Sequence, residues 1–218
     1  MMGSLAIPTP TPMRISMPSN RFDRRTFLTS AISGLCLTGL PLPALALSEN
    51  GARDLVGSVV GDINKVIASG KSEAAMIRDF EKIFIRYADV PIMAQYALGV
   101  DGRRASKAQM RAFTKAFQGY ISRKYGKRFR EFIGGGIKVK STRKIRAGYE
   151  VKSIATLQGQ APFEVTFLVS DKSGKDKFFN MFIEGVNLLL TERTEIGAML
   201  DHRKGNIDKL ISDLKKMS

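Results

Sequence analysis

The sequence has almost no cysteine or histidine and no tryptophan. Its 218 residues include one cysteine, Cys36, and one histidine, His202. A single cysteine excludes an internal disulfide, and so few cysteine and histidine side chains argue against a zinc or copper site. No glycine-rich phosphate loop or paired-carboxylate motif stands out, and Asp201 beside His202 has no serine in a nucleophile-elbow context. The composition therefore predicts a protein without a cofactor and without catalytic chemistry.

The sequence also lacks a long uninterrupted hydrophobic run. The strongest candidate, residues 31–46, is broken by two prolines and two glycines and is shorter than the roughly 20 residues that a membrane-spanning helix needs. It ends in ALA at 44–46, with small residues at the −3 and −1 positions of a cleavage site, which is typical of a secretory signal. We therefore expect residues 1–46 to be cleaved and Leu47 to become the N-terminus, with a short membrane anchor as the alternative.

A pair of arginines stands at the head of this segment. Arg24 and Arg25, followed by TFL at 26–28, resemble the twin-arginine consensus. The resemblance implies that the chain folds in the cytoplasm and is exported to the periplasm, with the general secretory (Sec) route as the alternative. Both Met1 and Met17 fit as the start of the chain.

Acidic residues are scarce beside basic ones. The chain has 20 Asp and Glu against 35 Lys and Arg, for a net charge of +15 at pH 7. Residues 1–46 carry four arginines and one aspartate, so their removal leaves +12. Such a charge favours acidic partner surfaces or anionic headgroups.

Residues 47–218 are expected to form a single α+β domain. Apolar residues recur every three or four positions over about 51–132, alternate over about 137–184, and return to the helical period over about 190–217. Helices are predicted at about 51–69, 72–87, 89–97, 106–132, 190–203 and 206–217.

The alternating region predicts four strands in an antiparallel meander, at 137–147, 149–158, 162–170 and 177–184, because turn-like residues separate them. Alternation places one apolar set on a common face. That set is Ile137, Val139, Ile145, Val151, Leu157, Phe163, Val165, Phe167, Val169, Phe179, Met181 and Ile183.

The predicted helix at 106–132 begins with a capping box, formed by Ser106 and Gln109. Its aromatic side chains share one stripe and its basic side chains the other faces. Nucleic-acid binding by stacking needs both kinds on one exposed surface, so we expect no nucleic-acid partner. The aromatic stripe is expected to cover the apolar sheet face. A filled core is the default there, since protein interiors usually pack without voids, and a cavity is the alternative.

Two spaced blocks of the sequence resemble the MlaC family, also called the toluene-tolerance auxiliary component. The first block is 96–99 (YALG) with 105–113 (ASKAQMRAF), Phe117, Tyr120 and Tyr125, and the second is 179–187 (FNMFIEGVN) with 191–209. At Asn180 and Asn187 the family commonly has aspartate and serine.

The resemblance implies a non-enzymatic periplasmic carrier whose cargo is glycerophospholipid. It implies a curved, four-stranded antiparallel sheet of the NTF2-like cone type, packed with helices around an apolar pocket, and so favours a cavity over a filled core. The implied partners are an inner-membrane ABC transporter complex with its MCE subunit, an outer-membrane lipoprotein complex and, transiently, the membrane surface.

The residues expected to contact lipid are those on the aromatic stripe, the apolar sheet face and the first family block. They are Met93, Tyr96, Leu98, Phe113, Phe117, Tyr120, Ile121, Tyr125, Val139, Val151, Val165, Phe167, Phe179, Met181, Ile183 and Val186. Two other functions stay open: an NTF2-like enzyme using Tyr149 or Glu184, and an adaptor subunit of a membrane complex that binds no lipid.

Overall fold

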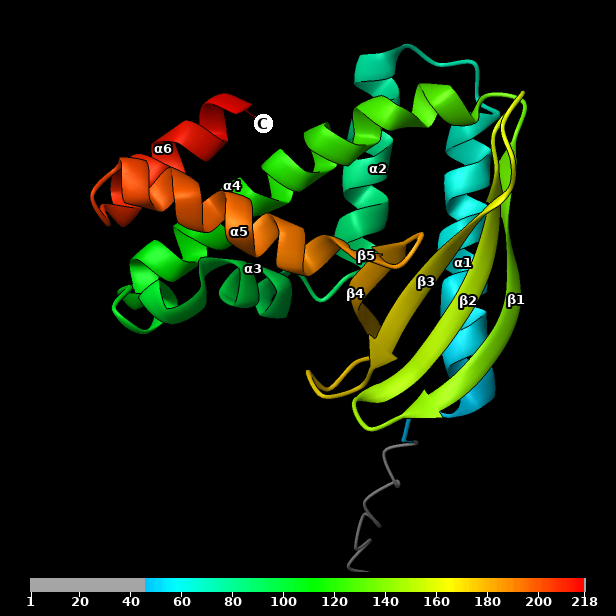
Figure 1. Ribbon diagram of the computed structural model, residues 1–218, viewed down its shortest axis with the longest axis horizontal. Coiled ribbons are helices and arrows are strands. Elements are labelled where there is room, and N and C mark those ends of the chain that lie inside the picture. The colour runs from blue at the N-terminus through cyan, green and yellow to red at the C-terminus, as the bar shows by residue number, and fades with distance from the viewer. Residues whose placement is uncertain (1–45, 218) are drawn as a thin grey trace, which may run out of the picture. The chain divides into compact units, whose positions relative to one another are not determined.

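The structure is a computed structural model that describes residues 46–217, apart from the side chains of Phe129 and Arg130 (Figure 1). The expected signal segment, residues 1–46 with its arginine pair, lies outside the described residues except for Ala46. No helix within 46–217 combines the length and the apolar character that a membrane span requires.

Helices come first, then the sheet, then helices again, as the periodicity predicts. The helices are α1 (Glu49–Ile67), α2 (Glu73–Tyr87), α3 (Val90–Leu98), α4 (Lys107–Gly126), α5 (Leu188–His202) and α6 (Ile207–Met217), with short 3-10 helices η1 (Gly99–Arg103) and η2 (Lys127–Phe132). The strands are β1 (Gly136–Ile145), β2 (Gly148–Thr156), β3 (Phe163–Ser170), β4 (Lys177–Ile183) and β5 (Val186–Asn187). The α+β class is confirmed.

The sheet is a curved antiparallel meander in the order β1-β2-β3-β4-β5 (Figure 1). It has one strand more than the four predicted. The extra strand exists because Glu184 and Gly185 both have positive φ, at 50° and 78°, and so form a tight turn that folds Val186 back beside Ile183. A two-residue strand is too short for alternation to reveal.

A bulge in β4 corrects the predicted face of that strand. Val169 pairs with Phe178, whereas Leu168 pairs with Asn180, so Phe179 is an extra residue between the two pairs. Residues directly opposite each other share a face, so Phe178 lies on the inner face with Val169. The assignment of Phe179 to that face is wrong.

A bulge in β1 has the same effect. The pairing shifts between Val139 and Ser141, after which Thr142 lies opposite Val151. Thr142 therefore points to the inner face, and the alternation that predicted Ile145 there is wrong beyond the bulge.

The helix that packs most extensively on the sheet is α1, not α4 as predicted; α3 and α5 make smaller contacts with β4. α1 lies against β1 and β2 (Figure 1). The Asn64 side chain fastens the two elements, because its amide donates to the Ile137 carbonyl and its oxygen accepts from the Ile137 N–H, both at 3.1 Å.

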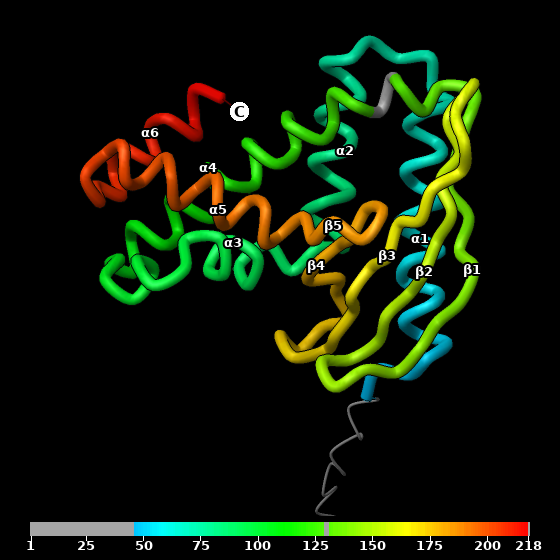
Figure 2. The backbone as a smooth tube through the Cα atoms, in the orientation of Figure 1, coloured from blue at the N-terminus to red at the C-terminus, as the bar shows by residue number. Residues whose placement is uncertain are grey.

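α4 packs on α2, α3 and α6 and faces the sheet across the interior (Figure 2). Its predicted capping box is present, since Ser106 and Gln109 bond reciprocally to each other's backbone N–H. The α-helix ends earlier than predicted, at Gly126, and the chain continues as the 3-10 helix η2. Gly126 packs closely on α2, since a Cβ added there would lie 3.2 Å from the Ile77 side chain.

Candidate functional site

Two apolar cavities lie between the sheet and the helices. The first, of about 60 Å³, is lined by Val59, Ile63, Phe80, Ile83, Phe84, Met93, Phe117, Ile121, Tyr125, Phe167, Phe178, Asn180, Met181, Leu188, Leu189 and Glu192. The second, of about 100 Å³, is lined by Ile63, Phe80, Tyr125, Arg128, Glu131, Phe132, Ile137, Leu157, Phe163, Val165, Phe167, Met181 and Ile183.

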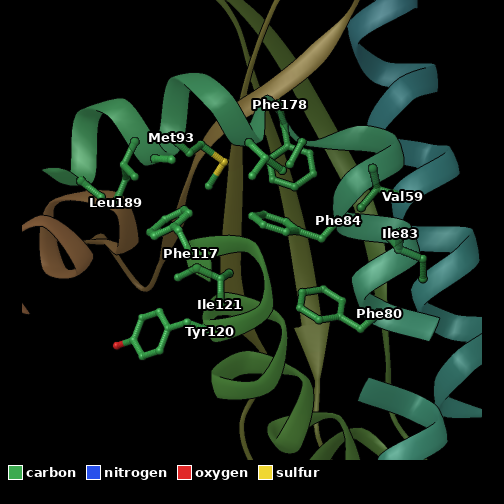
Figure 3. Close-up of a cluster of buried hydrophobic side chains, with 14 of the residues drawn as sticks. Val59, Phe80, Ile83, Phe84, Met93, Phe117, Tyr120, Ile121, Phe178 and Leu189 are labelled. Atoms are coloured by element: carbon green, nitrogen blue, oxygen red, sulfur yellow. The ribbon is translucent and has the colours of Figure 1, made fainter. Parts of the chain in front are cut away.

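The two cavities are neighbours in one apolar region. They share five lining residues, one from each of five elements: Ile63 (α1), Phe80 (α2), Tyr125 (α4), Phe167 (β3) and Met181 (β4). Side chains from α1, α2, α3 and α4 converge there, as Figure 3 shows for Val59, Phe84, Met93 and Phe117. The pocket expected between sheet and helices is therefore present, as narrow spaces at the centre of the hydrophobic core.

Half of the sequence-predicted contact residues line these cavities. They are Met93, Phe117, Ile121, Tyr125, Val165, Phe167, Met181 and Ile183. Met181 stands at the junction, opposite Phe167 on β3. The resemblance and the alternation thus located both the α4 wall and the β3–β4 wall.

The other half lie elsewhere. Leu98, Phe113, Tyr120 and Val151 are buried but line neither cavity, and Val139 and Phe179 are half-buried on the sheet. Tyr96 and Val186 are exposed, at 40% and 56%, and Tyr96 lies under the Arg193 guanidinium. These eight residues line neither cavity in this structure, and their contact with lipid stays a prediction.

Sequence reasoning missed the walls contributed by α1 and α2. Val59 and Ile63 come from α1, and Phe80, Ile83 and Phe84 from α2. Their helical spacing marks them as buried, which is the available signal, but periodicity does not say which buried face borders a void. Phe178 was missed because of the β4 bulge. Its ring packs edge-on against that of Phe167, with 5.6 Å between the ring centroids.

A charged cluster borders the first cavity. Glu192 of α5 lines that cavity and is 2% exposed; its Oε1 accepts from the Lys124 ammonium at 2.8 Å and from the Tyr125 hydroxyl at 2.6 Å. Lys124 also donates to Glu195 at 2.6 Å, and Glu195 accepts from the Tyr120 hydroxyl at 2.9 Å. We call these five residues the α4–α5 cluster. It links the two helices between the cavity and the surface.

The electrostatics of the cluster favour the charged lysine and the neutral phenols. Burial, with the neighbouring carboxylates, raises the pKa of Tyr120 and of Tyr125, so both hydroxyls remain protonated donors. Burial alone would lower the pKa of Lys124, but its hydrogen bonds to Glu192 and Glu195 outweigh burial and raise it. Lys124 is therefore a cation at neutral pH.

Asn180 and Asn187, where the resembling family commonly has aspartate and serine, join β4 to α5. The Asn180 amide donates to Asn187 Oδ1 at 3.1 Å, and the same oxygen caps α5 by accepting from the Leu190 N–H at 3.0 Å. These amides position the start of α5, and hence Glu192 one turn further on.

The site is suited to enclosing an apolar molecule. Its walls are aliphatic and aromatic except for four polar or charged residues: Asn180, Glu192, Arg128 and Glu131. Within residues 46–217 no cluster of three His, Cys, Asp or Glu side chains could hold a metal ion. Glu184 is exposed in the β4–β5 turn, unlike the buried acid or base of an enclosed active site.

The family model described as MlaC protein matches residues 57–216. Among solved structures, the chain is similar to the phospholipid-binding protein from Ralstonia solanacearum, which was solved in complex with a phospholipid. That likeness has a TM-score of 0.65 at 18% sequence identity and covers 76% of this chain and 96% of the other. It confirms the fold.

The family match covers most of the chain and includes both cavities. MlaC proteins are periplasmic lipid carriers and not enzymes, so the expectation of a non-enzymatic protein is confirmed. The chain belongs to the MlaC family.

Proposed function

We propose that this protein carries a glycerophospholipid across the periplasm, with its acyl chains in the apolar region between α4, α1, α2 and the sheet. The observation that carries the proposal is the pair of adjoining apolar cavities that share Phe167 and Met181. The Ralstonia relative with the same fold was solved with a phospholipid, which supports it.

Loading requires the cavities to widen. At about 60 Å³ and 100 Å³ they are far smaller than the roughly 300–1,000 Å³ that encloses drug-sized ligands. A lipid therefore enters by separating side chains or helices that touch in this structure. The residues that line the two cavities would then contact the acyl chains of the cargo.

The energetics require direct transfer between proteins. Two acyl chains bring on the order of 30 methylenes, and at about 0.8 kcal/mol each their exposure to water would cost roughly 24 kcal/mol. Release into solvent is negligible on that scale. We therefore propose docking to an inner-membrane ABC transporter complex with its MCE subunit and to an outer-membrane lipoprotein complex, guided by the net positive charge.

The basic residues available for docking on α4 are those that reach solvent. Lys107, Arg111 and Lys115 are exposed, whereas Lys124 is held by two carboxylates of α5. Reversing the charges of Lys107 and Arg111 should slow delivery to the transporter complex without removing bound lipid, and added salt should weaken the effect of the wild-type charges.

The proposed route begins with export by a twin-arginine signal and cleavage after Ala46. The arginine pair and the small residues at 44–46 support this proposal.

Mass spectrometry of an organic extract of the purified protein tests the carrier function. We expect phospholipid at close to one molecule per protein. An extract without phospholipid from several expression hosts would contradict it and favour the adaptor, a subunit that binds no lipid.

A further inference from the structure

The α4–α5 cluster contains one more negative than positive charge. Glu192 and Glu195 are both carboxylates, and the Lys124 ammonium is shared between them at 2.8 Å and 2.6 Å. The tyrosines of the cluster are neutral, because burial raises their pKa. In a strongly basic protein, this is a local site of negative charge on the wall of an apolar cavity.

One oxygen of the buried carboxylate is unused. Glu192 Oε1 accepts both hydrogen bonds, while Oε2 is buried and has no hydrogen-bond partner among the described residues. An ionised carboxylate accepts about four hydrogen bonds, and leaving one of its oxygens unpaired away from water is unfavourable. Over the part of the chain that the structure describes, no second cation is paired with Glu192.

The position of Glu192 fits the boundary between tail and headgroup. It lines the cavity beside the apolar Leu188 and Leu189 of the same helix, yet its partner Lys124 is 30% exposed at the side chain. A lipid with its tails in the cavity would place the polar end near such a boundary, within reach of both a carboxylate and an ammonium.

We propose that Glu192 accepts a hydrogen bond from the primary ammonium of a phospholipid headgroup and so selects ethanolamine lipids. The inference rests on the proposed carrier function. A primary ammonium brings both the missing positive charge and N–H donors for Oε2. A choline headgroup has the charge without an N–H donor, and a glycerol headgroup leaves the lipid anionic, so neither supplies both.

A loading competition tests this selection. Purified protein is incubated with vesicles containing equal amounts of phosphatidylethanolamine, phosphatidylcholine and phosphatidylglycerol with isotopically labelled chains, then repurified and extracted. We expect newly acquired phosphatidylethanolamine to exceed each of the other two about tenfold, since a hydrogen bond to a charged group has about that effect on an equilibrium.

Glu192→Gln keeps the shape but removes the charge and should bring the three lipids to near-equal loading. Glu164→Gln is the matched control, since Glu164 also binds a lysine, Lys152, but lies outside the α4–α5 cluster, is 42% exposed at the side chain and lines neither cavity; it should keep the preference. A thermal melt of each variant separates loss of selection from loss of fold.

The wild-type measurement alone can overturn the inference if Glu192→Gln does not fold. Wild-type protein that acquires the three lipids equally would refute selection and leave the carrier function standing. An unchanged preference in folded Glu192→Gln would reduce Glu192 to a link between α4 and α5. Wild-type protein that acquires no labelled lipid would instead refute the carrier function itself.

Discussion

Replacing Met181 with tryptophan distinguishes a space that receives cargo from an ordinary core imperfection. Met181 borders both cavities and faces Phe167 across the β3–β4 pair. The larger side chain would occupy the junction between the cavities. Because about 100 Å³ already lies open beside Met181, we expect the free energy of unfolding of the lipid-free protein to fall by less than about 1 kcal/mol, below the roughly 1–3 kcal/mol typical of overpacking.

The effect on lipid should be much larger. A ring at the junction takes the place of on the order of five methylenes of an acyl chain, which at about 0.8 kcal/mol each weakens binding by roughly 4 kcal/mol. That corresponds to about a thousandfold loss in competitive loading. The assay is a denaturant melt of delipidated protein together with a count of phospholipid per protein by mass spectrometry.

Val151→Trp is the matched control. Val151, on β2, is fully buried on the same inner face. It lies directly opposite Phe167 of β3 but lines neither cavity. Overpacking there should destabilise the fold by about 1–3 kcal/mol or more. If Met181→Trp destabilises the lipid-free protein as strongly as Val151→Trp, or retains a full lipid load, the junction is not the place where the acyl chains lie.

Three further predictions concern export, helix capping and pH. Changing Arg24 and Arg25 together to lysine should leave the precursor in the cytoplasm, and normal export of this variant on a fractionated immunoblot would indicate the Sec route. Asn187→Ala removes the α5 cap and an acceptor for Asn180, so the free energy of unfolding should fall by about 1–2 kcal/mol in a urea melt, while Asn187→Ser should restore part of it. Hydrogen bonds from Lys71 and Lys82 lower the pKa of Asp79 to about 2, so the stability that this carboxylate contributes is present above its unfolded-state pKa near 4 and is lost as the pH falls toward 2. Asp79→Asn should therefore lessen the fall in the free energy of unfolding between pH 5 and pH 2 by about 1 kcal/mol or less. An unchanged fall, measured by urea melts at several pH values, would contradict this.

The local order of helices and strands follows directly from the sequence. Hydrophobic periodicity and helix capping depend on residues three or four positions apart. Ser106 and Gln109 therefore predicted the start of α4 correctly. Short turns such as that before Gly148 joined consecutive strands, which determined the meander. The two family blocks then indicated a lipid-binding fold, and the family match confirmed the membership.

Only the tertiary structure decided which apolar side chains border open space. α1 forms part of the wall because Asn64 fastens it to Ile137 of β1, a contact across 73 residues that no local pattern records. The β4 bulge exchanged Phe179 for Phe178, because one extra residue reverses the alternation on which the prediction depended. Sequence reasoning did not single out Glu192. The packing of α5 beside α4 buries it with Lys124, and burial depends on which surfaces meet and not on residue type alone.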